Sequence, residues 1–239
     1  MDKKVSADSA EVPRRRGRPR AIVQAPTEIS PREEILRAAA TLFATQGFAA
    51  TTTRQIAEAV GIRQPSLFTH FENKQQIFET LVTGLITATG RIYELVLARW
   101  GSARPMVLLY ALFRADIHYL ATDPYRVGAF TSVRELEAAG FTPLIEERKR
   151  GLTLYRSVVE RGGEAGEFAY GDLEIASNLV YTMTESVITW SEQALQRPAA
   201  LLATEAADLM LRALLRRPAD LDVVKRLLAK QGDQFPTGI

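Results

Sequence analysis

The sequence has 239 residues, a hydrophobic fraction of 46% and a net charge of +2. A chain of this length can bury one large core, or a small domain joined to a larger one. It contains no cysteine and only two histidines, which excludes disulfides, thiol catalysis and cysteine-based zinc sites. Because no glycine-rich phosphate loop, metal-ligand cluster or nucleophile motif appears either, we expect no enzyme activity, no catalytic residue, no metal and no cofactor.

The hydrophobic and charged fractions, 46% and 24%, are ordinary for a globular chain. No apolar run approaches the roughly 18 residues of a membrane-spanning helix, and the N-terminus lacks the apolar core of a secretory signal. We therefore expect a soluble, cytoplasmic protein with no membrane partner.

Residues 1–29 show no helical apolar period and are predicted to form a disordered basic arm. The segment Arg14–Arg20 contains five arginines and no acidic residue. Its Arg-Gly-Arg-Pro core resembles an AT-hook, in which Arg16 and Arg18 would enter the minor groove of A·T-rich DNA. A solvated basic tail that gives only salt-sensitive, non-specific affinity explains the same residues equally well.

The first helix is predicted to begin after Ser30. Ser30 offers an N-cap, Pro31 suits the first helical position, and Glu33 is the capping-box partner. Gly47 follows the last turn as a stop signal. The apolar face between them carries Ile35, Leu36, Ala39, Leu42 and Phe43.

A second and a third short helix follow. Thr52 offers the N-cap of the second helix, Gly61 ends it, and Gln64 starts the third helix after a tight turn. Two short helices joined by a three- to four-residue turn that contains glycine are typical of a helix-turn-helix. The side chains of the third helix expected to face inward are Leu67, Phe68 and Phe71.

The rest of the chain is also predicted to be helical, because apolar residues recur at three- and four-residue steps and no alternating strand pattern or internal repeat appears. The fold class is therefore all-α: a three-helix helix-turn-helix domain over residues 30–76, a larger helical domain over 77–232, and a tail over 233–239. The later helices are expected at about 74–99, 104–121, 124–131, 141–161, 172–195, 200–217 and 219–230.

Residues 31–80 resemble the DNA-binding domain of the tetracycline-repressor (TetR) family, through a motif that is long and positionally strict. In that family a helical ligand-binding and dimerisation domain of variable sequence follows. The resemblance implies a sequence-specific transcriptional regulator, most simply a ligand-released repressor that binds a pseudo-palindromic operator as a homodimer. The residues that carry it are Ile35–Ala39, Leu42 and Phe43, Gly47 and Phe48, Thr52–Ala57, Val60–Ile62, Gln64–Phe68 and His70–Lys74.

The DNA contacts that the resemblance implies begin at the second helix. Thr52 and Thr53 lie at its positive end, where a hydroxyl and free N–H groups can meet a phosphate. Arg54 is expected to be exposed at the same end, and it is the best candidate for a bidentate contact to guanine O6 and N7. The alternative interpretation of Arg54 is a solvated helix charge.

The third helix is expected to present its first residues to the bases. Gln64 can pair bidentately with adenine, Pro65 can contact a thymine methyl, and Ser66 can reach a base or a phosphate. Many family members have a small capping residue where this chain has Arg63, so the arginine is a candidate for an additional base or phosphate contact. Gln64 and Pro65 also serve simply to start a helix.

The end of the third helix and the start of the next supply candidate phosphate contacts. His70 and Lys74 both resemble the family's phosphate-binding residues, which position the domain without reading sequence. Phe68 stands where relatives usually have a tyrosine. Without the hydroxyl, Phe68 either keeps a contact to DNA or belongs only to the core.

The C-terminal half is expected to dimerise and to hold an inducer. The apolar stripes over 172–195 and 200–217 fit the two helices that pair across a two-fold axis in the family, although any core helix shows such stripes. A small, hydrophobic or amphipathic molecule is expected to bind among the helices from 104 to 190. The candidate lining residues, which core packing explains as well, are Tyr110, Phe113, His118, Phe130, Tyr181 and Trp190, with Asp116 and Arg134 near His118.

A ligand that favours a conformation with the wrong separation of recognition helices must release DNA. Two other interpretations of the sequence stay open. One is an architectural protein that binds A·T-rich DNA mainly through the arginine arm, and the other is an activator built on the same fold.

Overall fold

The computed structural model describes residues 29–131, 136, 140–189, 197–230 and 232. The chain divides into two units, Met1–Ser30 and Pro31–Ile239, and the fold below is that of the second. Within the described residues the regular elements are helices, with one isolated bridge between Phe168 and Leu215. The all-α class is therefore confirmed. The expected residues that lie outside the described ones are Arg14–Arg20, Arg134, Trp190 and the tail over 233–239.

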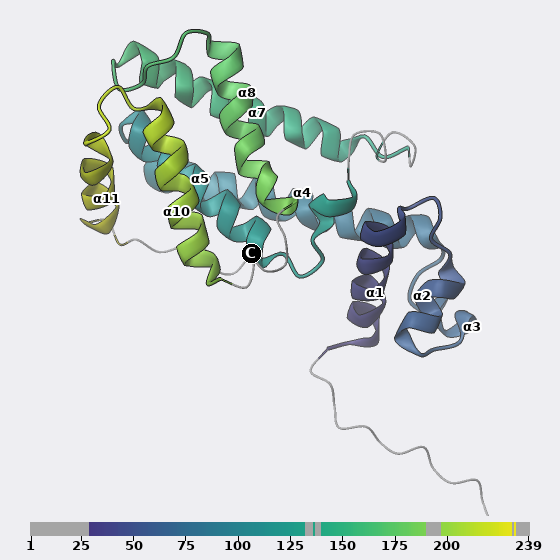
Figure 1. The fold of residues 1–239 in the computed structure, drawn as a ribbon. Coiled ribbons are helices and arrows are strands. Elements are labelled where there is room, and N and C mark those ends of the chain that lie inside the picture. Colours follow the sequence, from purple (N-terminus) through teal and green to yellow (C-terminus); the bar gives the residue numbers. More distant parts are fainter. Residues whose placement is uncertain (1–28, 132–135, 137–139, 190–196, 231, 233–239) are drawn as a thin grey trace, which may run out of the picture. The chain divides into compact units, whose positions relative to one another are not determined.

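Local signals account for the N-terminal helices (Figure 1). Thr52 and Gln55 form a reciprocal capping box before α2, and Gly61 ends that helix with a left-handed φ of 75°. The side chain of Asn73 accepts a hydrogen bond from the backbone N–H of Gln76 at 2.8 Å and caps α4. The bounds are Pro31–Gln46 for α1, Thr53–Val60 for α2, Gln64–Leu67 for α3 and Lys74–Trp100 for α4.

Two of the later helices are shorter than expected. The 124–131 helix is only a 3-10 turn, because the Asp123 carboxylate accepts the N–H groups of Tyr125 at 3.0 Å and Val127 at 2.8 Å. The helix expected over 172–195 ends as an α-helix at Glu185 and continues as a 3-10 turn. The bounds are Pro105–Thr122 for α5, Val127–Phe130 for η1, Pro143–Glu164 for α7, Leu173–Glu185 for α8, Ser186–Thr189 for η2, Ala199–Leu214 for α10 and Asp220–Lys230 for α11.

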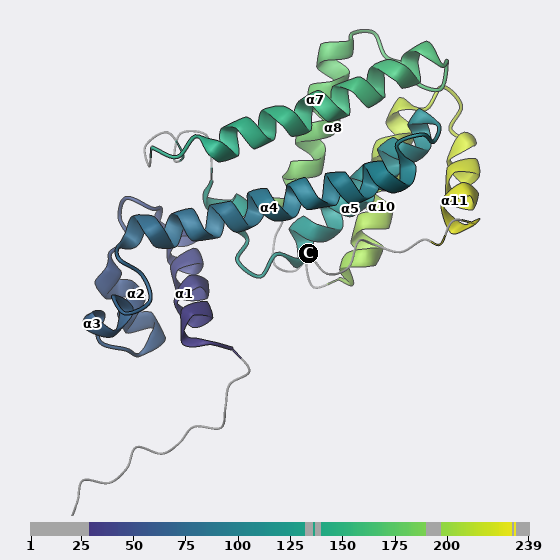
Figure 2. The same ribbon diagram turned by 180° about the vertical axis from the view of Figure 1, so that it is seen from behind.

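The buried side chains form two core clusters, and α4 contributes to both of them. This long helix packs against α1 toward one end and against α5 toward the other (Figure 2). The first cluster joins α1, α2, α3 and the first half of α4 to η1. Its centre is Phe78, whose ring centroid lies 4.7 Å from that of Phe48 and 5.9 Å from that of Phe43. The second cluster surrounds α5, which is buried from Met106 to Ile117 and packs against α4 and α10.

α4 is long and apolar enough to cross a membrane by length and composition alone, with a mean hydropathy of 1.3 over 18 residues. The expectation that no apolar run approaches this length is therefore wrong for α4. The two cores account for part of its apolar composition: Ile77, Phe78 and Leu81 are buried in the first, whereas Ile92 and Val96 are buried in the second.

Candidate DNA interface and ligand cavity

Most side chains expected to contact DNA are exposed. Thr53 and Gln64 are half-buried because they join α2 to α3: the Gln64 amide donates a hydrogen bond to the Thr53 hydroxyl at 2.9 Å. This bond fixes the start of α3 against the start of α2. The expected contact residues that are exposed are Thr52, Arg54, Arg63, Pro65, Ser66, Phe68 and His70.

Arg54 is paired within its own helix. Its Nε donates to the Glu58 carboxylate at 2.8 Å, while 78% of the arginine side chain stays exposed. The hydrogen bond to Glu58, followed by the charge of Glu58, raises the pKa of Arg54. Because exposed pairs of this kind contribute little to stability, the guanidinium can turn toward DNA at small cost.

Phe68 does not face inward as expected, since 47% of it is exposed. α3 has only four residues, and Leu67 and Phe71, four positions apart, take the buried positions instead. The interpretation of Phe68 as a purely core residue is therefore wrong. Its ring is exposed on the helix-turn-helix, as are the side chains of Ser66 and His70, two positions before and after it in the sequence.

Lys74 has a structural role that the sequence analysis missed. Its Nζ donates to the backbone carbonyls of Phe48 at 2.6 Å and Thr51 at 2.7 Å, and it lies 4.3 Å above the Phe48 ring. Burial lowers the pKa of Lys74. The ammonium group thus holds the turn between α1 and α2. No local signal could have revealed this, because the partners lie 23 and 26 residues away.

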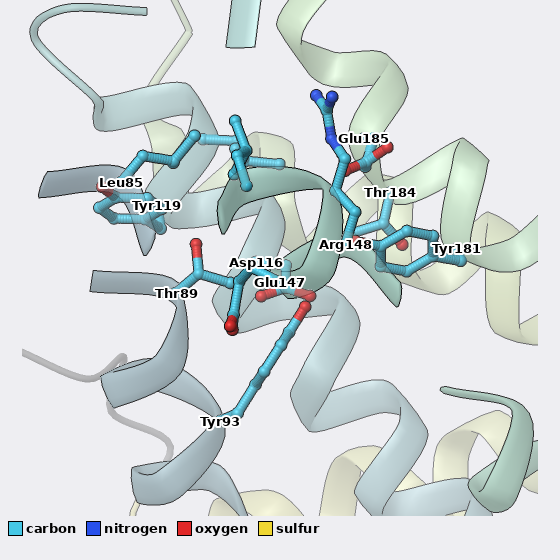
Figure 3. Close-up of a pocket in the computed structure, with 12 residues that line it drawn as sticks. Leu85, Thr89, Tyr93, Asp116, Tyr119, Glu147, Arg148, Tyr181, Thr184 and Glu185 are labelled. Carbon is cyan, nitrogen blue, oxygen red and sulfur yellow. The ribbon is translucent and has the colours of Figure 1, made fainter. Parts of the chain in front are cut away.

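A cavity of about 40 Å³ lies among α4, α5, α7 and α8 (Figure 3). It has room for about three water molecules. Of the five expected ligand-binding residues that the structure describes, Tyr181 alone lines it, and Asp116 lines it as well. Its walls are formed by Leu85, Thr89, Tyr93, Asp116, Tyr119, Leu120, Leu144, Glu147, Arg148, Tyr181, Thr184 and Glu185.

The carboxyl group of Asp116 is buried in the wall of this cavity. It accepts a hydrogen bond from the Tyr155 hydroxyl at 2.5 Å and another from Tyr93, and burial raises its pKa to about 7. Burial also raises the pKa of Tyr93, and the charges of Asp116, Glu185 and Glu147 raise it further. Both shifts are due first to burial, and the neighbouring carboxylates add to them.

Arg148 connects the cavity to η1. Its Nε donates to the Glu185 carboxylate at 3.2 Å, and its Nη1 donates to the backbone carbonyl of Thr131 at 2.6 Å. The buried Thr131 hydroxyl in turn donates to the carbonyl of Val127 at 3.0 Å. A continuous set of hydrogen bonds thus leads from the cavity wall to the 3-10 turn.

The structure places four other expected ligand-binding residues, all within the described part of the chain, away from the cavity. Tyr110 is buried, and its hydroxyl donates to Asp208 at 2.6 Å. Phe113 packs in the second core, and His118 is half-buried outside the lining. Phe130 belongs to the first core because η1 directs its ring toward Phe43, 5.5 Å away between centroids.

α8 and α10, the helices expected to dimerise, leave apolar side chains exposed. Ile175 and Leu179 of α8 are 62% and 58% exposed, and Leu209 of α10 is 71% exposed. An open groove of about 490 Å³ runs between the two helices. Met183 of α8 and Leu201 of α10 are also exposed apolar side chains.

Comparison with known proteins agrees with this arrangement. Residues 35–81 match the model of bacterial regulatory proteins of the tetR family, and residues 108–214 match a tetracyclin repressor-like C-terminal domain. The HTH-type transcriptional repressor KstR2 of Rhodococcus jostii is 30% identical over 162 residues, which cover 66% of this chain and 78% of the relative.

Two solved structures share the fold. That of the ketosteroid transcriptional regulator KstR2 of Mycobacterium tuberculosis is 24% identical, covers 79% of this chain and 96% of its own, and has a TM-score of 0.68. That of AmtR from Mycobacterium smegmatis is 28% identical, covers 92% of this chain and all of its own, and has a TM-score of 0.64. The chain therefore belongs to the TetR family, as a DNA-binding transcriptional regulator and not an enzyme.

Proposed function

We propose that this protein is a cytoplasmic repressor that binds a pseudo-palindromic operator as a homodimer and releases it when a small molecule binds. Residues 30–76 read the DNA, residues 77–232 dimerise and hold the ligand, and the arm over residues 1–29 adds affinity. Repression is the activity named for the KstR2 relatives. The residues proposed to contact DNA are Thr52, Thr53, Arg54, Arg63, Gln64, Pro65, Ser66, Phe68 and His70, with Lys74 supporting them and Arg16 and Arg18 added by the arm.

The observation that carries this proposal is the apolar face of α8 and α10. Ile175, Leu179 and Leu209 are each more than half exposed, and Ile175 and Leu179 border the groove between the two helices. Soluble monomers rarely expose contiguous apolar surface of this kind. Pairing with the same face of a second copy would bury it and would place two recognition helices on half-sites about 34 Å apart.

Ligand-controlled release is supported by contacts that join the cavity to α1. Arg148 of the cavity wall binds Thr131, next to η1. Phe130 of η1 packs against Phe43 of α1, and the hydroxyl of Tyr125 donates to the Glu33 carboxylate of α1. A molecule that enlarges the cavity would therefore change the support of α1, and with it the orientation of the helix-turn-helix.

The proposal is tested by selecting binding sites from random duplexes with the full chain at near-physiological salt. We expect a pseudo-palindrome with two half-sites. Arg54→Ala should reduce the preference for one base pair in each half-site by about 1–3 kcal/mol of binding free energy. Leu209→Glu should give a monomer in light scattering and lower operator affinity by about 100-fold or more, because a buried charge opposes pairing. Ser157→Glu, on exposed α7 surface, is the matched control.

Recovery of only A·T-rich sequence without dyad symmetry would contradict the repressor mechanism and favour an architectural role for the arm. Deletion of residues 1–30 also distinguishes the proposed repressor from an architectural protein. An architectural protein would lose nearly all affinity, whereas the proposed repressor should keep its sequence preference and lose part of its strength.

A further inference from the structure

The cavity contains more acidic groups than its own basic group can neutralise. Asp116, Glu147 and Glu185 line it, against one arginine, Arg148. Glu185 binds Arg148, and Glu147 binds Arg150 at 3.1 Å from the outer side of α7. Within the described part of the chain, no lysine or arginine forms an ion pair with Asp116, whose hydrogen-bond donors are the phenols of Tyr155 and Tyr93.

We propose that this cavity binds a small organic cation, an ammonium group on an apolar body, with Asp116 as the residue that holds the positive charge. This inference adds a ligand class to the proposed ligand-controlled release, and its role in regulation rests on that proposal. A buried carboxyl group without a cationic partner is costly to a fold. A group of this kind at a cavity wall suits a ligand that supplies the missing charge.

The walls fit an ammonium ion better than an anion or a metal. Tyr93 and Tyr181 add aromatic rings and hydroxyl groups that can face a cation. Their hydroxyls meet near Gly151 of α7, where an added Cβ would lie 2.8 Å from that of Tyr181 and 3.0 Å from that of Tyr93. Among the described residues, no group of three or more histidine, aspartate or glutamate side chains could hold a metal ion.

The same site offers a way to connect binding with release. A cation beside Glu185 competes with Arg148 for that carboxylate, which accepts a hydrogen bond from the Arg148 Nε at 3.2 Å. Arg148 also holds the carbonyl of Thr131 at 2.6 Å. Displacement of Arg148 therefore removes a hydrogen bond from Thr131, the residue that follows η1.

The test uses three probes of nearly equal size, each larger than the cavity, so that all three must enlarge it to a similar extent: hexylammonium, hexan-1-ol and hexanoate. Their dissociation constants for the full chain without DNA are measured by calorimetry or ligand-observed NMR. We expect hexylammonium to bind about tenfold or more tightly than hexan-1-ol, and hexanoate to bind weakest, since charge-assisted hydrogen bonds are the strong ones. Equal or tighter binding of hexanoate would overturn the proposal.

Variants test whether Asp116 is the residue that binds the ammonium group. Asp116→Asn keeps the side-chain shape and should weaken hexylammonium by about tenfold while leaving hexan-1-ol within about twofold. Glu160→Gln, which removes an exposed charge from α7, should change neither. If Asp116→Asn folds poorly, the dissociation constant of hexylammonium is measured on Glu185→Gln instead, which removes a second lining charge at a half-buried position. An unchanged affinity of Asp116→Asn for hexylammonium would also overturn the proposal.

A final experiment distinguishes a failure of the cation site from a failure of the proposed function. Hexylammonium is added to the complex with the selected operator, with Asp116→Asn as the control for ionic effects on DNA. Binding through Asp116 without loss of operator affinity would leave the cation site standing and reject ligand-controlled release. Failure to select an operator would reject the DNA-binding proposal, while the dissociation constants still decide the site.

Discussion

The helix-turn-helix and the cavity differ in how far apart in sequence their interacting residues lie. In the helix-turn-helix, Thr52 bonds to a residue three positions away and Arg54 to one four positions away. In the cavity, Tyr155 reaches Asp116 across 39 positions and Arg148 reaches Glu185 across 37. The first region is organised by local signals, and the second depends on how whole helices pack.

The largest expected effect compares two phenylalanines at the DNA-binding end. Phe78 is fully buried at the centre of the first core, whereas Phe68 is 47% exposed. Phe78→Ala should lower the free energy of unfolding by about 3–5 kcal/mol because it leaves a cavity. Phe68→Ala should change it by less than about 0.5 kcal/mol and weaken operator binding instead.

Urea unfolding and operator binding, measured on both variants, check this contrast. A large loss of stability in Phe68→Ala would return Phe68 to the core. Normal stability together with normal operator affinity would show that its exposed ring has no function in DNA binding.

The contrast between local and long-range partners explains what the sequence could predict. Thr52, Gly61 and Asn73 begin or end helices through neighbours, so the helix order and the helix-turn-helix follow from sequence patterns. Phe68 was misplaced because a four-residue helix has too few turns to define a buried face. Phe130 was misplaced because an aromatic residue in a later segment carries no local sign of which core it joins.

Lys74 provides a second test, because it is the long-range exception within the helix-turn-helix. Lys74→Met should lower the free energy of unfolding by about 1–3 kcal/mol, since the carbonyls of Phe48 and Thr51 lose their donor. Operator affinity should keep its dependence on salt. Arg63→Met, at an exposed position, should instead keep the stability. It should make the slope of log binding constant against log salt concentration smaller by about 1.

The outcome that contradicts this assignment is equally clear. If Lys74→Met keeps full stability and reduces the salt slope as Arg63→Met does, Lys74 binds phosphate and its contact to the α1–α2 turn is incidental.

The smallest expected effect concerns Asp116 and pH. Its pKa is about 7 in the folded chain because of burial, against about 3.9 in an unfolded chain. The unfolded state therefore loses this proton first, so the contribution of Asp116 to stability is fully present below about pH 4 and is lost as the pH rises through 7.

Asp116→Asn removes this dependence. Relative to the unmodified chain, the variant should gain about 1 kcal/mol or more in free energy of unfolding between pH 5 and pH 8. Unfolding curves at four pH values measure the difference, and Glu160→Gln should show no such trend. A difference that does not vary with pH would mean that Asp116 is ionised throughout this range.

α4 bears on how regulators of this kind could be recombined. A chimaera joined at residue 76 would separate α1 from Ile77, Phe78 and Leu81, which complete its core. A graft that transfers operator specificity should therefore carry α4 at least as far as Ile86 and should change sequence before Ile92, where the second core begins. The short segment between these two residues is the natural crossover point for exchanging DNA-binding ends.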